Sequence, residues 1–233
     1  MPRFDIIKEC NPDNTFRVQS VVDAFTMNVS HITEHFEGCI DIEGKPWNVG
    51  LIVGGSGTGK STIARDVFRD AVWGVGDYVA KSVIDDMPQG IPLKDIEQMF
   101  TSVGFASPPS WLKPYGVLSN GEKMRCDLAR ALLQAGDKIV VFDEFTSVVN
   151  REVAKTASFA VQKAVRRKGA RFVAVSCHDD VIEWLMPDWV YNTDEKRFFG
   201  VAVGIDRKSS LTSMKSAERI KKMLGRSFAS ITI

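Results

Sequence analysis

Residues 54–61 read Gly-Gly-Ser-Gly-Thr-Gly-Lys-Ser, which fits the phosphate-binding pattern G-x-x-x-x-G-K-[ST]. The apolar residues 49–53 predict a buried strand before it, and apolar positions between 63 and 71 predict a helix after it. In this context a glycine loop turns its backbone N–H groups toward phosphates, and the helix N-terminus adds its positive dipole end. We therefore expect a nucleoside triphosphate to bind here, through contacts from Gly54, Gly55, Ser56, Gly57, Thr58, Gly59, Lys60, Ser61 and Thr62.

Two side chains of this loop and two later acids predict the chemistry of the site. Lys60 is expected to reach the β- and γ-phosphates, and the Ser61 hydroxyl is expected to bind Mg²⁺. Asp143 and Glu144 follow the apolar strand 139–142, and ligands bind at the carboxyl ends of parallel strands. We predict that Asp143 completes the Mg²⁺ site and that Glu144 polarises an attacking water as general base.

Composition places the chain among ordinary globular proteins. Of its 233 residues, 44% are hydrophobic and 25% are charged, and the formal net charge of +1 gives no overall signal for nucleic acid or an anionic membrane. The four cysteines are widely spaced, which favours reduced thiols in a cytosolic protein. No apolar run approaches the ~18 residues of a spanning helix. We expect a cytoplasmic protein that does not itself insert into a membrane.

Hydrophobic periodicity predicts an alternation of strands and helices, which is typical of an α/β fold with a mostly parallel sheet. The first ~50 residues are predicted to form strands separated by turns, including 16–25 and 39–42. The later predicted strands are 80–84, 138–142 and 172–176, and the later predicted helices are 91–105, 120–134 and 151–168.

Two further positions are candidates for contact with phosphate. Ser119 and Glu122 form an S-x-x-E capping box that opens a helix, but a capping box does not require Gly121. A glycine there suits the close approach of an anion to backbone N–H groups. His178 ends the predicted strand 172–176 at its carboxyl end, where it would reach a γ-phosphate; a structural histidine is the plainer alternative.

Together these motifs resemble the nucleotide-binding domain of the ATP-binding-cassette (ABC) family, over about residues 16–200. Their order is that of the family: phosphate loop 54–62, an LSGGQ-like signature at 118–122, the acidic strand 139–144, the D-loop 147–150 and the switch histidine His178. The resemblance implies a P-loop NTPase with a RecA-like core, an antiparallel β-subdomain and a short helical subdomain that carries the signature. We place the ATPase domain at 1–205, its helical subdomain at about 85–135, and a separate tail at 206–233.

The resemblance also implies a mechanism. ATP would be sandwiched between the phosphate loop of one copy and Ser119 and Gly121 of a second copy, so that two copies complete two sites. Glu144 would activate water, and His178 would sense the γ-phosphate. The family stacks adenine on an aromatic residue before the phosphate loop, for which Phe25 is favoured over Phe16 and Trp47, with core packing as the alternative. It also places a glutamine near Mg²⁺, and Gln89 is the candidate, with an ordinary turn residue as the alternative.

Three positions depart from the family pattern. Asn120 replaces the first glycine of the signature, Phe145 replaces a proline, and Asn150 replaces the D-loop aspartate, which puts a cross-dimer contact in doubt. The segment between Lys60 and Ser119 is also short for a transporter subunit. The chain is therefore most similar to stand-alone soluble cassettes of bacteria and phages.

The tail at 206–233 combines an apolar stripe at helical spacing with many basic residues. Packing on the cassette is one interpretation, and docking to nucleic acid or a protein partner is another. We predict an ATPase that dimerises with ATP and couples closure to an unknown protein partner or a nucleic-acid process. The alternatives are the motor subunit of a membrane transporter and an ATP-gated binding module with weak hydrolysis.

Overall fold

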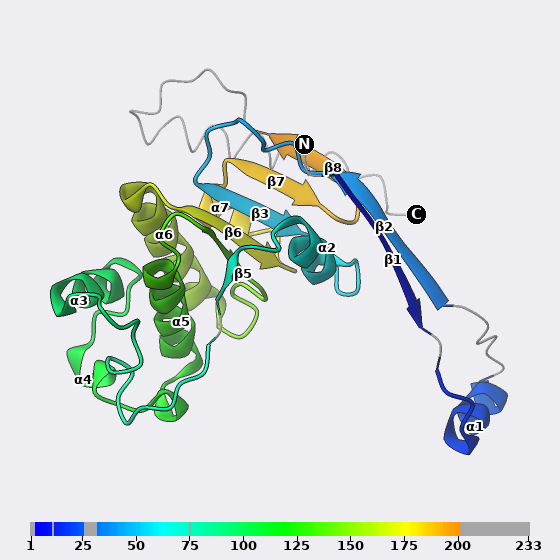
Figure 1. Cartoon of the computed structure of the whole chain (residues 1–233), viewed down its shortest axis with the longest axis horizontal. Coiled ribbons are helices and arrows are strands. Elements are labelled where there is room, and N and C mark those ends of the chain that lie inside the picture. Colours follow the sequence, from blue (N-terminus) through cyan, green and yellow to red (C-terminus); the bar gives the residue numbers. More distant parts are fainter. Residues whose placement is uncertain (1–2, 11, 26–31, 75, 201–233) are drawn as a thin grey trace.

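The computed structural model describes residues 3–10, 12–25, 32–74 and 76–200 (Figure 1). The tail at 206–233 lies outside these residues. Within them, no helix combines the length and the apolar composition needed to cross a membrane.

A six-stranded sheet in the order β4-β5-β6-β3-β7-β8 forms the centre of the fold. Its neighbouring strands are parallel except for the antiparallel pair β7–β8. Parallel sheets are buried on both faces, and the apolar residues of the central strand divide accordingly, with Leu51 in one core cluster and Ile52 in the other. The strands are Val49–Val53 (β3), Val72–Trp73 (β4), Ile139–Phe142 (β5), Arg171–Ser176 (β6), Trp189–Asn192 (β7) and Arg197–Gly200 (β8).

Helices cover both faces of this sheet. On one face, Phe100, Leu128 and Val161 come from three helices and share a core cluster with Leu51. The helices of this side are Leu93–Ser102 (α3), Pro108–Trp111 (α4), Asn120–Gln134 (α5), Arg151–Lys168 (α6) and Val181–Leu185 (α7), with a 3₁₀ turn at Tyr115–Val117. On the other face, Ile63 of Lys60–Val67 (α2) packs in the second cluster.

A separate two-stranded antiparallel hairpin joins the second face. It consists of Arg3–Cys10 (β1) and Ile32–Cys39 (β2), and Phe4 packs edge-on against Tyr191 of the main sheet with ring centroids 5.6 Å apart. The helix Phe16–Phe25 (α1) lies beyond the far end of this hairpin, away from the body of the molecule (Figure 1).

Several predicted elements are confirmed. The helices predicted at 120–134 and 151–168 are α5 and α6 with the same bounds, and the strand predicted at 49–53 is β3. The strands predicted at 138–142 and 172–176 are β5 and β6, each within one residue. The helix predicted at 91–105 is shorter, because Pro92 precedes its first residue with a non-helical ψ of 140° and Gly104 takes a left-handed φ of 85° just after its end.

The strand predicted at 16–25 is wrong, because this segment forms α1. The β-branched residues of this segment favour a strand by composition. Their spacing is that of a helix, because the apolar residues Val18, Val21, Val22 and Phe25 follow the i, i+3, i+4, i+7 pattern and do not alternate. The Ser20 hydroxyl donates to the carbonyl of Phe16, one turn back. Helical periodicity therefore outweighs strand propensity here.

Two other strand predictions are also wrong. Residues 80–84 form turns, because Val83 N and Ile84 N donate to the carbonyls of Lys113 and Trp111 instead of to a sheet neighbour. The alternating residues 39–42 do not form a strand of their own, since β2 ends at Cys39.

Candidate nucleotide site

The phosphate loop joins the carboxyl end of β3 to the N-terminus of α2, as its motif predicts. Lys60 is the first residue of α2, and Gly59 precedes it with a left-handed φ of 80°. The first backbone N–H groups of a helix have no partner within the helix. The loop therefore presents free N–H donors and the positive helix end at one place, where an anion binds favourably.

Lys60, Ser61 and Asp143 are brought together at this place. The Ser61 hydroxyl donates to Asp143 Oδ1 over 2.9 Å, although the two residues come from α2 and from the end of β5. Lys60 is a buried residue, and its Nζ donates to the Gly55 carbonyl over 2.5 Å. A hydroxyl and a carboxylate at this spacing are the hard oxygen donors that Mg²⁺ prefers, and Mg²⁺ fills its other positions with phosphate oxygens and water. These residues therefore fit the predicted metal.

The backbone after β5 turns sharply at Glu144. Glu144 is exposed and has a φ of 52°, and Thr146 has a φ of 68°; such values are uncommon for residues other than glycine. The turn is held by Phe145, which is fully buried and whose N–H donates to the Val175 carbonyl over 2.8 Å. Phe145 also packs against Phe172 at 5.7 Å between ring centroids. The aromatic residue that replaces the family's proline is thus part of the core that fixes the direction of Glu144.

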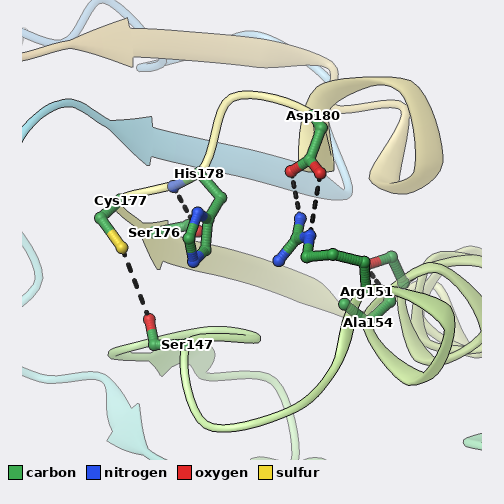
Figure 2. A network of polar contacts seen from close by, with 8 residues as sticks. Ser147, Arg151, Ala154, Ser176, Cys177, His178 and Asp180 are labelled. Atoms are coloured by element: carbon green, nitrogen blue, oxygen red, sulfur yellow. Dashed lines mark hydrogen bonds and ion pairs between the residues drawn. The ribbon is translucent and has the colours of Figure 1, made fainter.

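His178 lies in the loop after β6, beside the segment that follows Glu144 (Figure 2). Its backbone N–H donates to the Ser176 hydroxyl over 3.1 Å. The neighbouring Cys177 Sγ lies 3.8 Å from the hydroxyl of Ser147. The second contact between these two segments is the ion pair between the Arg151 guanidinium and the carboxylate of Asp180, in which Nε donates over 2.9 Å (Figure 2). The predicted D-loop, 147–150, and the loop that carries His178 therefore lie against each other.

Asn150, which replaces the D-loop aspartate, has a local role. Its side-chain oxygen accepts a hydrogen bond from Val153 N over 2.9 Å and caps the N-terminus of α6. Asparagine and aspartate are equally good helix caps, so this substitution leaves the start of α6 intact.

Ser119 and Glu122 form the predicted capping box at the start of α5. Ser119 Oγ accepts from Glu122 N over 3.4 Å, and Glu122 Oε2 accepts from Ser119 N over 2.9 Å. The carboxylate also accepts a hydrogen bond from the Ser110 hydroxyl, and this bond together with those from Ser119 lowers the pKa of Glu122 to about 2. A Cβ atom on Gly121 would lie 3.0 Å from Val153 Cγ1, so tight packing against α6 also accounts for this glycine.

The aromatic residue at the phosphate loop is Phe36, which the sequence prediction missed. A Cβ atom on Gly59 would lie 2.3 Å from the ring of Phe36, which reaches the loop from β2. The strand alignment that favoured Phe25 fails, because Phe25 and Phe16 lie on α1 and are 72% and 87% exposed. Trp47 is buried against Trp189 in the core. No motif marks Phe36, since its position depends on the hairpin folding over the loop.

Gln89 is exposed in a turn of the long loop between β4 and α3. The strand predicted at 80–84, just before Gln89, does not form. Gln89 is nevertheless the one glutamine between Trp73 and Leu93, so it remains the predicted glutamine near Mg²⁺. Sequence analysis also missed Asp194, which follows β7 and accepts hydrogen bonds from Gly55 N.

Comparison with known proteins supports this reading of the fold. No protein-family model and no curated protein matches the chain. Among solved structures, the dimeric post-hydrolysis state of the ATP-binding cassette MJ0796 bound to ADP and Pi has a TM-score of 0.58 at 14% identity, covering 77% of this chain and 95% of that one. CbiO1 from Clostridium perfringens, described as part of the ABC transporter complex cbiONQ, has a TM-score of 0.54 at 19% identity, covering 74% and 83%. A bacterial Atm1-family ABC exporter with ATP bound has a TM-score of 0.53 at 18% identity, covering 74% and 37%.

The parallel sheet, the loop between β3 and α2, and these three similarities agree with the resemblance seen in the sequence. The chain has the α/β fold of an ATP-binding-cassette nucleotide-binding domain.

Proposed function

We propose that this chain binds ATP·Mg²⁺ at the phosphate loop and hydrolyses it at composite sites shared by two copies of the chain. The observation that carries the proposal is the 2.9 Å contact between Ser61 and Asp143, which unites a phosphate-loop hydroxyl with a strand-end carboxylate. Lys60 would move from the Gly55 carbonyl to the β- and γ-phosphates. Phe36 is then the aromatic residue best placed for the base.

Glu144 and His178 would carry the hydrolytic step. Glu144 is exposed at the carboxyl end of β5, one residue after Asp143, and serves as general base toward a water at the γ-phosphate. His178, at the carboxyl end of the neighbouring strand β6, would contact the same phosphate. Asp143 supplies the carboxylate for the metal, so the two acids have separate roles.

In this proposal a second copy of the chain completes each site, and two observations support it. Among the described residues, no hydrogen bond joins the segment 118–122 to the loop 54–62; α5 instead contacts α3, α6, β4 and β5. The compared cassette MJ0796 is described as dimeric, which supports the same arrangement here. Ser119 and Gly121 would contact ATP held by the partner copy.

The proposal is tested by ATP binding and turnover. Lys60→Ala should abolish tight ATP binding, because no other loop residue supplies a point charge to the phosphates. Glu144→Gln should bind ATP but hydrolyse it on the order of 10²–10⁴-fold more slowly. Equal ATP affinity for Lys60→Ala and wild type by calorimetry would refute the phosphate site. A Glu144→Gln enzyme with at least half the wild-type rate would remove Glu144 from catalysis.

A transporter motor subunit is the second candidate, because two of the compared structures are described as parts of ABC transporters. Co-purification with a membrane protein would favour it, and salt-sensitive binding of DNA or RNA would favour a nucleic-acid process. Stoichiometric ATP retention by the wild type without turnover would instead indicate an ATP-gated binding module.

A further inference from the structure

The turn between β7 and β8 contacts the phosphate loop through two side chains. Both carboxylate oxygens of Asp194 accept from Gly55 N, at 3.1 and 3.0 Å. The hydroxyl of Thr193 lies 2.6 Å from the hydroxyl of Thr58. The contact follows from the topology, because β7 is the direct neighbour of β3, and Thr193 N donates to the carbonyl of Val53 at the end of β3 over 2.9 Å.

This turn is itself held firmly. The buried side chain of Asn192 accepts from Asp194 N over 2.9 Å and from Glu195 N over 3.2 Å. This Asx-type turn fixes the backbone together with the hydrogen bond from Thr193 N to Val53. The Asp194 carboxylate is therefore presented to the loop from a rigid support.

The first glycine of the motif is explained by the same turn. A Cβ atom on Gly54 would lie 2.1 Å from Thr193 Oγ1, far inside van der Waals contact. The loop could not approach the turn this closely with any other residue at position 54. The turn and the start of the phosphate loop thus form one packed unit.

The peptide groups around Gly55 are held from both sides. The Gly55 carbonyl accepts from Lys60 Nζ over 2.5 Å and from Thr58 Oγ1 over 2.9 Å, while the Gly55 N–H is taken by Asp194. When Lys60 moves to a phosphate, the carbonyl loses its charged partner. The Asp194 carboxylate remains on the N–H of the preceding peptide group, between Gly54 and Gly55. A reversal of that group would turn the Gly54 carbonyl oxygen toward the negative charge of Asp194, so the carboxylate holds the backbone next to the carbonyl that Lys60 releases.

The contact occupies one predicted phosphate donor and leaves the helix end of the loop open. The Gly55 N–H is taken by Asp194, whereas the first N–H groups of α2 lie at the opposite end of the loop and have no partner within the helix. The carboxylate therefore holds the strand end of the loop while the helix end stays open.

We propose that Asp194 is a positioning residue for nucleotide binding, which keeps the start of the phosphate loop in its binding conformation while Lys60 changes partners. The inference rests on the proposed binding of ATP. Loss of this contact would let the free loop adopt other conformations, and the apparent affinity falls with the fraction of molecules that remain competent.

The test compares the affinity of the full chain for Mg²⁺ and a non-hydrolysable ATP analogue, by calorimetry, in four proteins. Asp194→Ala should bind about tenfold more weakly than wild type, the size expected for one lost charge-assisted hydrogen bond. Asp194→Asn keeps an acceptor for Gly55 N and should stay within about threefold. Glu195→Ala removes an equal charge from the same turn. Among the described residues the Glu195 side chain makes no hydrogen bond or ion pair with the loop, so the affinity of this variant should also stay within about threefold.

Melting temperatures of the four proteins show whether each variant is folded. Wild-type affinity in Asp194→Ala would overturn the positioning role and leave ATP binding intact. Equal losses in Asp194→Ala and Glu195→Ala would also overturn it, since removal of charge would then explain both. A wild type that binds no nucleotide would overturn the proposed function and this inference together.

Discussion

Asp127 lies in the middle of α5 and is 5% exposed, where a charged carboxylate is unfavourable. Burial raises the pKa of Asp127 to about 6, despite a 2.7 Å hydrogen bond from the Tyr115 hydroxyl. Because the folded-state pKa lies above the ordinary value of 3.8, the folded protein binds more protons than the unfolded chain between about pH 4 and 6. The contribution of Asp127 protonation to the free energy of unfolding is therefore complete below about pH 4 and is lost as the pH rises through about 6.

Asp127→Asn should therefore stabilise the protein at neutral pH. Asparagine keeps the shape and the acceptor for Tyr115 but never ionises, so the free energy of unfolding at pH 8 should rise by roughly 1–3 kcal/mol. The gain should shrink as the pH falls through 6 and vanish near pH 4. Urea unfolding at several pH values measures it, with the exposed Asp137→Asn as a control. A variant no more stable than wild type at pH 8 would contradict the prediction.

Single residues could be predicted from the sequence when they lie inside a continuous motif, and could not when they reach the site from a distant part of the chain. The proximity of Ser61 to Asp143 could be predicted from the sequence, because each belongs to a motif that adjoins a strand with a clear apolar pattern. Phe36 and Asp194 could not, because each reaches the loop from a separate strand, and their contacts exist only once the hairpin and the β7–β8 turn have folded over it. Gly54 and Gly121 belong to predicted motifs, but the structure adds a second reason for each glycine. A side chain at these positions would lie too close to Thr193 and Val153, respectively.

At the scale of elements, Arg151 and Asp180 join the start of α6 to the start of α7. The ion pair is partly exposed, and the guanidinium also lies 5.0 Å from the ring centre of Trp184. Exposed pairs contribute about 0.2–1 kcal/mol, and an exposed cation–π contact adds a similar amount. Arg151→Met loses both interactions and should lower the free energy of unfolding by about 1–2 kcal/mol, whereas Asp180→Asn loses one and should cost under about 1 kcal/mol.

The same two variants should alter the environment of His178, because Asp180 anchors the loop that carries it. The chain has three histidines, so the imidazole signals of His178 can be assigned in an NMR spectrum by comparison with His178→Ala. Both variants should shift these signals. Lys45→Met breaks the ion pair with Asp41, which has comparable exposure, and should leave the His178 signals in place. Unmoved signals in all three variants would show that the ion pair does not position His178.

Elements were predicted best where one periodicity dominated. The helices α5 and α6 were predictable to the residue because Ser119 and Asn150 cap their starts and an apolar face repeats along each. The segment 16–25 was misassigned because its valines and phenylalanines favour strands individually, while their spacing is helical. The short β4 gave no signal, since two residues cannot establish a period.

For the whole molecule, the proposed composite sites predict that ATP controls the association of two copies. Glu144→Gln should accumulate ATP and, in the proposed mechanism, hold two copies together. Nucleotide that binds the dimer more tightly than the monomer must shift the association equilibrium. Light scattering should therefore show a dimer with ATP·Mg²⁺ and a monomer without it. A single mass under both conditions would contradict ATP-driven association.

Composite sites make a sharper prediction about mixtures of inactive variants. Ser119→Arg places a bulky cation at the N-terminus of α5, where the partner's γ-phosphate would approach, and it should block turnover while sparing ATP binding to a single subunit. It also removes the helix cap, which costs about 1 kcal/mol, and Ser119→Ala is the matched control because it loses the cap without adding bulk.

Lys60→Ala is inactive for the opposite reason, since it lacks the phosphate charge but keeps an intact signature. A heterodimer of Ser119→Arg and Lys60→Ala regenerates one complete site, so mixing the two proteins should restore part of the ATPase rate that neither shows alone. If Ser119→Arg alone kept full activity and a normal melting temperature, Ser119 would be only a helix cap and the composite site would be wrong.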